Sequence, residues 1–551
     1  MASDHRGQTP GVRGDGVRPR PPGRTGSDPG RRITHSQCVI GRLGSDPGRA
    51  RASRFATAVA LSATLAACGA QKPPATAPHR PSRAERQLAA DLDSVFGAPA
   101  MAQGLWGVEI KSLDSGRVLY ALNPRKLMMP ASNMKIVTLA TAARSLGWDF
   151  RFTTTLETAA PIENGALTGD LIVRGSGDPT INSRDQRAAK VFDDWALALR
   201  GLGITRIDGN IVGDDNAFDD EGLGAGWAWD YLQYGYAAPV GALQYNEDVA
   251  ALTISAGASP GTPAVAALAS GAGLRLVNRA YTGEPASEVT IDYTRRLDAP
   301  VLEISGSIPA GAAPITRDVA VVNPTIFFAQ ALKDGLTARG IAVAGTAVDA
   351  DDQMNLPAPA TRRALVQTQS PPLRDIATTM MKVSENLYAE TLLKASAAAK
   401  GGLGTTAGGR LVTRDVLAGW GIPDSSYIQV DGSGLSRYDY VTAEMLVGIL
   451  EHAYREPALH DAFVATLPIA GRDGTMRSRL KNTRGEANAT AKTGSIANVR
   501  TLSGYVRTRD GETLVFSMLA NNFAIPSSTV TWIADLAVET LSNFTSRGGV
   551  Q

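Results

Sequence analysis

Helical and strand periodicities both occur along this chain and divide it into segments of different type. Apolar residues recur every three or four positions in the segments predicted to be helices, which are 84–96, 186–202, 324–339, 372–382, 387–400 and 530–544. Alternating or short apolar runs predict the strands, which are 106–111, 118–121, 153–158, 167–174, 204–212, 249–255, 289–293, 300–305 and 319–322. The pattern favours an α/β protein with a strand-rich middle.

Two further segments combine several local signals. Residues 130–147 are predicted to form a helix, because Pro130 suits a first turn and Gly147 suits a helix end. Near the C-terminus, residues 496–507 alternate, the chain turns at Arg509-Asp-Gly511, and residues 513–520 return. This pattern predicts a hairpin with Lys492-Thr-Gly494 in its entry strand.

The length of 551 residues indicates two to four domains. The strand-rich middle contains far more residues than one loop can hold, and residues 351–361, with their Asp, Pro and Ala, are typical of a linker that leaves it. One or two inserted domains therefore account for the middle of the chain.

The first fifty residues are rich in Gly, Pro and Arg and are predicted to be disordered, because they cannot bury enough apolar surface. They are either a basic arm or a stretch upstream of the true translation start. Residues 51–68 favour the second interpretation, because Arg51 and Arg54 precede a short apolar run that ends at Leu65-Ala-Ala-Cys68, as in an export signal. Residues 69–83 are predicted to be a proline-rich tether.

Charge and residue counts argue against several classes of function. The formal net charge of +2 combines +7 over residues 1–54, from 11 Arg against 4 Asp, with −5 over the rest, so nothing indicates a nucleic acid partner. Cys38 and Cys68, the two cysteines, lie outside the predicted globular part, which therefore has no disulfide. Only His452 and His460 lie within it, which argues against a zinc site or a Ser-His-Asp triad and predicts no metal and no cofactor.

Three short motifs together contain the residue types of a serine-type catalytic site. Ser132 and Lys135 are three residues apart, so they share a helix face, and a lysine of lowered pKa can take the proton of a serine hydroxyl. Ser384-Glu-Asn386 is the only Ser-x-Asn in the chain, and Lys492-Thr-Gly494 is the only Lys-Thr-Gly. Their order is the one that serine penicillin-recognising enzymes require.

Each motif also has a structural interpretation. Ser-x-x-Lys occurs again at Ser478-Arg-Leu-Lys481, so it can mark nothing more than a helix start. Ser384-Glu-Asn386 lies at the junction of two predicted helices and could cap the second one. Lys492 could be an ordinary strand lysine followed by a turn glycine. The joint occurrence of the three motifs in this order favours catalysis.

On these motifs the chain resembles the D-alanyl-D-alanine carboxypeptidase/endopeptidase family of low-molecular-mass class C penicillin-binding proteins, peptidase family S13. Five further blocks and the large insert share the resemblance; the blocks are Gly175-Ser-Gly-Asp-Pro-Thr180, Gly226-Trp-Ala-Trp-Asp230, Tyr236-Ala-Ala-Pro239, Asp431-Gly-Ser-Gly-Leu-Ser-Arg437 and Gly471-Arg-Asp-Gly-Thr475. The resemblance covers residues 85–545. It implies a transpeptidase-like (β-lactamase-like) α/β domain, split into residues 84–155 and 366–551, with mostly β inserted domains over residues 156–365.

The resemblance also implies a role for each motif residue. Ser132 would form an acyl-enzyme with Lys135 as the base, and the backbone N–H groups of Ser132 and Ser495 would form the oxyanion hole. Ser384 and Asn386 would relay a proton to the leaving amine and hold the substrate amide.

The third motif and two charged residues would bind the substrate. Lys492 would tune the charge of the site, and Thr493, next to Gly494, would hydrogen-bond the terminal carboxylate. Asp178 and Arg437 would meet charged groups of the substrate's side chain. Alternatively, Asp178 is a turn residue and Arg437 braces residues 431–436.

The implied function is a serine D,D-peptidase that hydrolyses D-alanyl-D-alanine and D,D-crosslinks of peptidoglycan stem peptides and is acylated by β-lactam antibiotics. Cys68 resembles the lipidated cysteine of bacterial lipoproteins, which implies an exported, periplasmic protein anchored to the outer membrane; the alternative is an incidental thiol in a cleaved signal peptide. Two other functions stay open, a β-lactamase and a β-lactam sensor or cell-wall-binding lipoprotein without turnover. The balance between the two peptidase activities, the preferred diamino acid, the translation start and the oligomeric state are also open.

Overall fold

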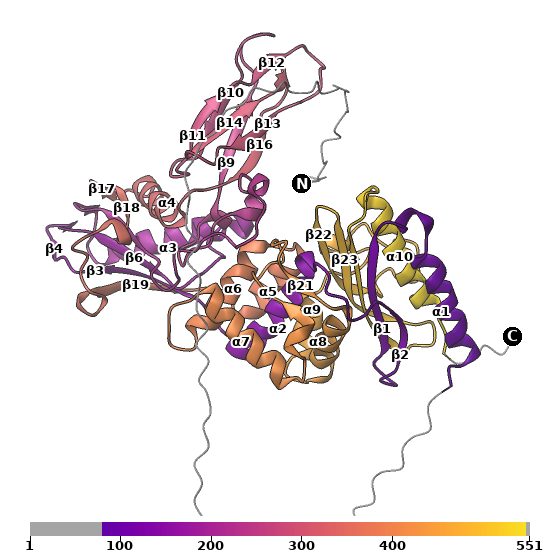
Figure 1. Ribbon diagram of the computed structural model, residues 1–551. Coiled ribbons are helices and arrows are strands. Elements are labelled where there is room, and N and C mark those ends of the chain that lie inside the picture. Colours follow the sequence, from indigo (N-terminus) through magenta and orange to yellow (C-terminus); the bar gives the residue numbers. More distant parts are fainter. Residues whose placement is uncertain (1–79, 547–551) are drawn as a thin grey trace, which may run out of the picture. The chain divides into compact units, whose positions relative to one another are not determined.

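The computed structural model describes residues 80–546 (Figure 1). Both ends of this range contribute to one antiparallel five-stranded sheet of order β2-β1-β24-β23-β22. Its strands are β1 (Leu105–Ser112), β2 (Val118–Leu122), β22 (Thr490–Ile496), β23 (Val499–Arg507) and β24 (Thr513–Asn521). The Lys-Thr-Gly motif therefore lies in β22, at one edge of the sheet.

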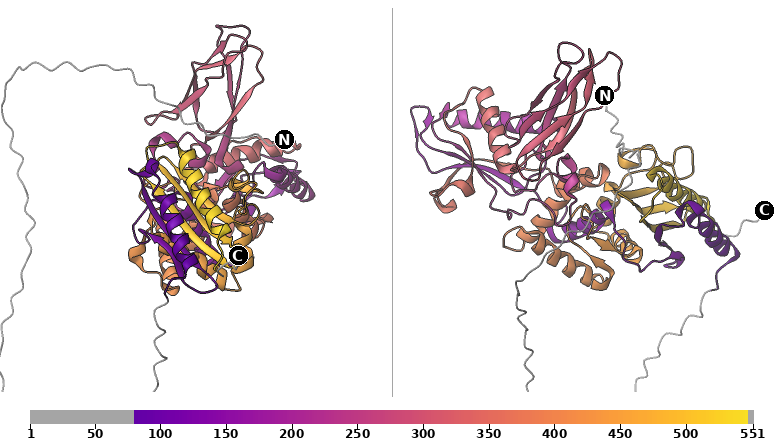
Figure 2. Two further views of the ribbon diagram at one scale, coloured as in Figure 1. Left: turned by 90° about the vertical axis from the view of Figure 1, so that its right-hand side faces the viewer. Right: turned by 45° about the horizontal axis from the view of Figure 1, so that its top comes forward.

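Two helices, α1 (Arg83–Phe96) and α10 (Ser527–Asn543), lie side by side on one face of this sheet (Figure 2). A capping box begins α1, because the Ser82 hydroxyl accepts from the backbone N–H of Glu85 and the Glu85 carboxylate accepts from the N–H of Ser82. The first and last elements of the described chain thus share one hydrophobic core.

A group of helices covers the opposite face. Alternate residues of β24 point to different cores: Phe516 packs with α1 and α10, whereas Val515 packs with the helix group. The helices are α2 (Met134–Leu146), α5 (Leu373–Lys382), α6 (Asn386–Ala398), α7 (Thr406–Gly419), α8 (Ala443–Arg455) and α9 (His460–Thr466). A short pair, β20 (Tyr427–Ile428) and β21 (Tyr440–Val441), accompanies them. All residues from Met134 to Ala143 are buried, so α2 is the central helix of this group.

The chain between α2 and α5 forms separate sheets. One has the order β18-β8-β6-β3-β19 and another the order β17-β7-β5-β4, and α3 (Arg187–Gly201) and α4 (Pro324–Ala338) pack with them around Trp195. The strands are β3 (Thr153–Thr158), β4 (Ile162–Glu163), β5 (Ala166–Leu167), β6 (Leu171–Gly175), β7 (Arg206–Ile207), β8 (Ile211–Asp214), β17 (Ala342–Val343), β18 (Ala347–Asp349) and β19 (Arg363–Gln369).

Three small sheets follow, of orders β10-β9-β16, β11-β14-β13 and β12-β15. They share a core of their own that includes Leu252, Ile304 and Val319. The strands are β9 (Val249–Ser255), β10 (Val265–Leu268), β11 (Arg275–Asn278), β12 (Tyr281–Gly283), β13 (Asp292–Arg295), β14 (Val301–Ser305), β15 (Ser307–Pro309) and β16 (Ile315–Ala320). The strand-rich middle predicted from the sequence is therefore present.

The predicted helices are all found, but the one predicted for residues 130–147 begins later. Pro130 is followed by a 3-10 turn, Ala131–Asn133, and the α-helix begins at Met134. Ala131 has a φ of 45°, a left-handed conformation that a continuous helix excludes. Gly147, with a φ of 83°, ends the helix as predicted.

The strand predictions were less accurate. The predicted strands 167–174 and 204–212 are each divided into two, the strand predicted at 289–293 lies at Asp292–Arg295, and that predicted at 319–322 lies at Ile315–Ala320. Residues 351–361 contain two short 3-10 turns and lead into β19. The C-terminal hairpin prediction missed a second turn at Ala497-Asn498, where Asn498 has a φ of 60°. Asn tolerates this conformation, so Lys492–Gly494 lie in a separate strand that pairs with β23.

The predicted disordered extension, the signal segment with Cys68 and all but the last residues of the tether lie outside the described residues. Within residues 80–546, no helix has both the length and the apolar character needed to cross a membrane.

Candidate active site

Ser132 lies on the 3-10 turn that precedes α2, and this turn is fixed against the edge of the five-stranded sheet. Thr501 Oγ1 donates to the carbonyl oxygen of Pro130 at 2.8 Å, and Asn133 Nδ2 donates to the carbonyl oxygen of Lys492 at 2.9 Å. The first and third motifs therefore meet, although they are far apart in sequence. Ser132 itself is partly exposed, as a nucleophile must be.

Lys135 lies one turn further along, with its Nζ 3.1 Å from Ser132 Oγ. Its side chain is fully buried. Burial lowers the pKa of Lys135 to about 8, against the opposing effect of the carboxylates of Asp431 and Glu390. A lysine with such a pKa is partly neutral near physiological pH, which a general base requires.

The other contacts of Lys135 Nζ orient its lone pair. The nitrogen lies 2.5 Å from Oδ1 of Asn386 and 2.9 Å from the carbonyl oxygen of Ser433. A neutral amine has two N–H bonds and one lone pair. When these two acceptors take both N–H bonds, the lone pair faces Ser132 Oγ and can accept its proton.

Ser384 and Asn386 reach the site from the junction between α5 and α6. Ser384 has a φ of 67°, so the chain breaks its helical path there and α6 begins at Asn386. Lys492 Nζ donates to Ser384 Oγ at 2.8 Å, and Asn386 Nδ2 donates to the carbonyl oxygen of Tyr236 at 2.7 Å. The three motifs therefore converge on Ser132, while Glu385 supplies the cap at the start of α6.

Lys492 is fully buried, and its Nζ also donates to the carbonyl oxygen of Thr493 at 2.9 Å. Burial lowers the pKa of Lys492 well below the usual value for lysine, and the nearby ammonium of Lys135 lowers it further. Two close amines beside a hydroxyl thus favour a neutral form in at least one of them.

Thr493, Gly494 and Ser495 line a pocket of about 270 Å³ together with Thr475 and Thr501, and its other residues include Trp106 and Val530 from the core beneath α10. Ser132 is not among the lining residues. Thr493 Oγ1 donates to Thr475 Oγ1 at 2.7 Å, so the two hydroxyls form a pair. A side chain at Gly494 would overlap Thr501 Oγ1 and would lie 3.0 Å from the backbone nitrogen of Ser132. Only glycine lets β22 pass this close to the nucleophile. Ser495 is exposed and pairs with Arg500 across the hairpin.

Asp178 and Arg437 have contacts of their own within the protein. Asp178 is 3% exposed and accepts from the hydroxyl and backbone N–H of Thr180 and from the Arg187 guanidinium. Burial raises the pKa of Asp178. Arg437 donates to the carbonyl oxygen of Ala497 at 3.3 Å, in the turn after the Lys-Thr-Gly strand. The Asp178 contacts match its interpretation as a turn residue. The Arg437 side chain, in contrast, hydrogen-bonds Ala497 and not a residue of the segment 431–436 that it was predicted to brace. The substrate contacts of both residues stay predictions.

The site also contains residues that lie outside the three motifs. Thr475 lies in the block Gly471–Thr475, and Ser433 and Asp431 lie in the block Asp431–Arg437; the resemblance had identified both blocks without a role. Glu390 lies four residues after Asn386, and this helical spacing was its only signal in the sequence.

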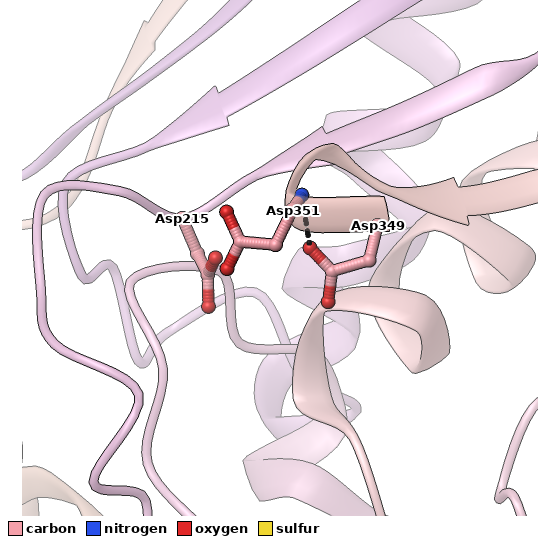
Figure 3. Close-up of side chains that lie close together, drawn as sticks. All are labelled: Asp215, Asp349 and Asp351. Atoms are coloured by element: carbon pink, nitrogen blue, oxygen red, sulfur yellow. Dashed lines mark hydrogen bonds between the residues drawn. The ribbon is translucent and has the colours of Figure 1, made fainter. Parts of the chain in front are cut away.

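Among residues 80–546, one carboxylate group has spacing suited to a metal, namely Asp215, Asp349 and Asp351 (Figure 3). Thr325 Oγ1 donates to Asp215, and Asn323 Nδ2 and the N–H of Asp351 donate to Asp349. Asp215 follows β8, Asp349 ends β18 and Asp351 lies in the 3-10 turn after it, and none of the three contacts the Ser132 site by the hydrogen bonds described above.

A model of the D-Ala-D-Ala carboxypeptidase 3 (S13) family matches residues 88–539. A D-alanyl-D-alanine carboxypeptidase of Actinomadura sp. (strain R39) is 32% identical over 458 residues, covering 80% of this chain and 82% of the relative. D-alanyl-D-alanine carboxypeptidase DacB of Haemophilus influenzae is 29% identical over 430 residues, covering 76% of this chain and 85% of the relative.

A crystal structure shows the same fold. Penicillin binding protein 4 (dacB) from Haemophilus influenzae matches with a TM-score of 0.71 and 26% identity, over 83% of this chain and 99% of that one. The fold class predicted from the sequence, a penicillin-binding-protein fold with strand-rich insertions, is therefore confirmed. By the extent of these matches, the chain belongs to the D-Ala-D-Ala carboxypeptidase 3 (S13) family.

Proposed function

We propose that Ser132 is the nucleophile with which this chain performs the serine D,D-peptidase reaction of its family on peptidoglycan stem peptides. The observation that carries the proposal is the environment of Lys135, whose buried Nζ has two carbonyl acceptors and faces the Ser132 hydroxyl at 3.1 Å. No other base is needed at this hydroxyl, because the pKa of Lys135 is lowered to about 8.

In the acylation step, Ser132 Oγ attacks the carbonyl carbon between two D-alanine residues while its proton moves to Lys135 Nζ. The amide C–N bond then breaks, and the leaving amine takes up a proton. The Ser384 hydroxyl, bonded to Lys492 Nζ at 2.8 Å, would deliver this proton and take one in turn from the Lys492 ammonium. Water later attacks the ester and gives its proton back to Lys492 through Ser384. Lys135 returns its proton to Ser132 Oγ as the ester bond breaks, so the enzyme is regenerated.

The oxyanion of the tetrahedral intermediate would be bound by the backbone N–H groups of Ser132 and Ser495. The close approach of β22 to the nitrogen of Ser132 at Gly494 supports this role. Each such donor typically contributes about 3 kcal/mol to transition-state stabilisation. Thr493 on this strand and Thr475 in the 3-10 turn Gly474–Met476 present paired hydroxyls that would bind the terminal carboxylate, with Lys492 supplying positive charge.

A β-lactam presents a strained amide to the same hydroxyl, so we expect it to acylate Ser132. A structure of Haemophilus influenzae penicillin binding protein 4 has been solved with a β-lactam, which supports this expectation. We also propose that D,D-crosslinks are substrates, because the amide that is cut has the same form in a crosslink as in a free D-alanyl-D-alanine end.

D-alanine release from a pentapeptide, measured for the wild type and for Ser132→Ala, tests the proposal. We expect release to disappear in Ser132→Ala while the protein stays folded. Release that survives the substitution would contradict the assignment of Ser132. Acylation by a fluorescent penicillin without any release would favour the sensor, and rapid penicillin turnover would favour a β-lactamase.

We further propose that the protein is exported and that a lipid on Cys68 anchors it in the outer membrane. The export-signal pattern of residues 51–68 and a substrate in the cell wall support this proposal. Labelling with a palmitate analogue, in cells that produce the wild type or Cys68→Ser, tests it. Incorporation should be lost in Cys68→Ser, and equal labelling of both proteins would contradict the anchor.

A further inference from the structure

The buried carboxylate of Glu390 contacts the loop that in turn contacts Lys135, the general base. Glu390 belongs to none of the three motifs. Its side chain is 5% exposed and lies on α6, one turn after Asn386. We propose that Glu390 is a positioning residue that fixes the carbonyl oxygen of Ser433 and thereby the orientation of the Lys135 amine. This inference deepens the proposed function, since it rests on Lys135 acting as the base.

The first contact is between Glu390 and the loop that contains Ser433. The two carboxylate oxygens accept from the consecutive backbone N–H groups of Gly432 and Ser433, each at 2.8 Å. Burial, together with the nearby Asp431 carboxylate, raises the pKa of Glu390 to about 8, so this site disfavours the ionised form of the acid. Because the two hydrogen bonds come from successive backbone amides, they fix both the position and the orientation of the Gly432-Ser433 peptide.

The second contact is between the loop and Lys135. The carbonyl oxygen of Ser433 lies 2.9 Å from Lys135 Nζ, and Thr138, one turn further along α2, donates its hydroxyl to the carbonyl oxygen of Gly432 at 2.6 Å. The loop is thus held from α6 by Glu390 and from α2 by Thr138. Within this arrangement the Ser433 carbonyl is a rigid acceptor for one N–H of Lys135.

One helix therefore sets both acceptors that orient the base. Asn386 on α6 contacts Lys135 Nζ directly at 2.5 Å, and Glu390 on the same helix acts through Ser433. If either acceptor moves, an N–H of the neutral amine can rotate toward Ser132 Oγ in place of the lone pair. The neighbouring Asp431 has a different task, because its carboxylate binds Gly434, Ser436 and the indole of Trp227.

Glu390→Gln tests the proposal, because the amide keeps the size of the side chain but turns an N–H₂ group against one backbone N–H. We expect the rate of acylation at saturating fluorescent penicillin to fall about 100-fold, the cost typical of a displaced catalytic group. The penicillin concentration at half-saturation should stay within twofold, because Glu390 does not touch the bound penicillin.

Glu157→Gln is the matched control. Glu157 is also 5% exposed and binds Arg174, but it lies in the β3 strand of a different sheet. Both substitutions should lower the melting temperature, and only Glu390→Gln should slow acylation. A folded Glu390→Gln protein that acylates at the wild-type rate would overturn the proposal.

Thr138→Val provides the second variant if Glu390→Gln does not fold. It removes only the hydrogen bond to the Gly432 carbonyl, so we expect a smaller fall in the saturating acylation rate, of about 5–10-fold, at unchanged half-saturation. An unchanged rate in this variant would also overturn the proposal. Ser132→Ala distinguishes a failure of this proposal from a failure of the proposed function. Activity that survives Ser132→Ala would contradict the role of Ser132 as the nucleophile, whatever the effect of Glu390→Gln.

Discussion

Lys492 Nζ and Ser384 Oγ lie 2.8 Å apart, although 108 positions separate the two residues in the chain. In the part of the chain that the structure describes, no carboxylate forms an ion pair with Lys492, and burial lowers its pKa well below the ordinary value. The fold therefore keeps a buried amine next to a hydroxyl at a cost in stability. Such a cost is typical of functional sites.

Two buried lysines should therefore differ in how their replacement by methionine changes the free energy of unfolding. Lys492→Met should abolish D-alanine release without lowering the free energy of unfolding, because it removes a buried amine that has hydrogen bonds but no ion-pair partner among the described residues. Lys394 is 2% exposed and forms an ion pair with the largely buried Asp219, so Lys394→Met should lower the free energy of unfolding by about 3 kcal/mol. Urea unfolding and a D-alanine assay on both variants check this. A Lys492→Met protein less stable than Lys394→Met would show that Lys492 is chiefly structural.

The pH dependence of acylation should report the Lys135 amine. Its pKa is lowered to about 8, and only the neutral amine can accept the Ser132 proton. The saturating rate of acylation should therefore rise as pH increases through about 8 and level off above it. Stopped-flow measurements from pH 6 to 10, with circular dichroism to verify the fold at each pH, test this. A rate that falls over this range would contradict a neutral lysine as the base.

Gly494→Ala should nearly abolish activity for a steric reason. Its methyl group would overlap Thr501 Oγ1 and lie 2.8 Å from the Pro130 carbonyl oxygen, so β22 or the nucleophile turn must shift. A shift of about 1 Å at the reacting groups costs roughly 100-fold in rate. The control is Gly448→Ala on α8, where a methyl group meets nothing within 4 Å, so this variant should keep full activity. Equal acylation rates in the two variants would refute the close approach.

The parts of this site that the sequence predicted are those with strong local signals. The helices predicted from the sequence are all present, but no bounds were predicted for α7, α8 and α9. The three motifs identified Ser132, Lys135, Ser384, Asn386 and Lys492, which the structure brings together. The left-handed backbone of Ala131 and Ser384 had no such signal, because neither residue type prefers it. Tertiary packing imposes both conformations.

The parts that were missed depend on contacts between distant segments. From the sequence, Glu390 cannot be distinguished from any other helical glutamate. Only the fold brings the backbone amides of Gly432 and Ser433 into contact with its carboxylate. The short strands between α2 and α5 were misplaced because segments of two to six residues contain too few periods to fix their ends. The predicted boundaries of the inserted region, residues 156–365, stay a prediction.

Asp178 provides a test of a substrate-binding prediction. Because its carboxylate already binds Thr180 and Arg187, Asp178→Asn should lower the free energy of unfolding by about 1–3 kcal/mol through a mispaired buried amide. The ratio of kcat/KM values for stem peptides with and without a free side-chain amine should stay within twofold of the wild type. Thermal melts and D-alanine release on the two peptides measure both quantities. A tenfold loss confined to the amine-bearing peptide, at unchanged stability, would instead establish Asp178 as a substrate contact, because a buried turn residue has no means to distinguish the two peptides.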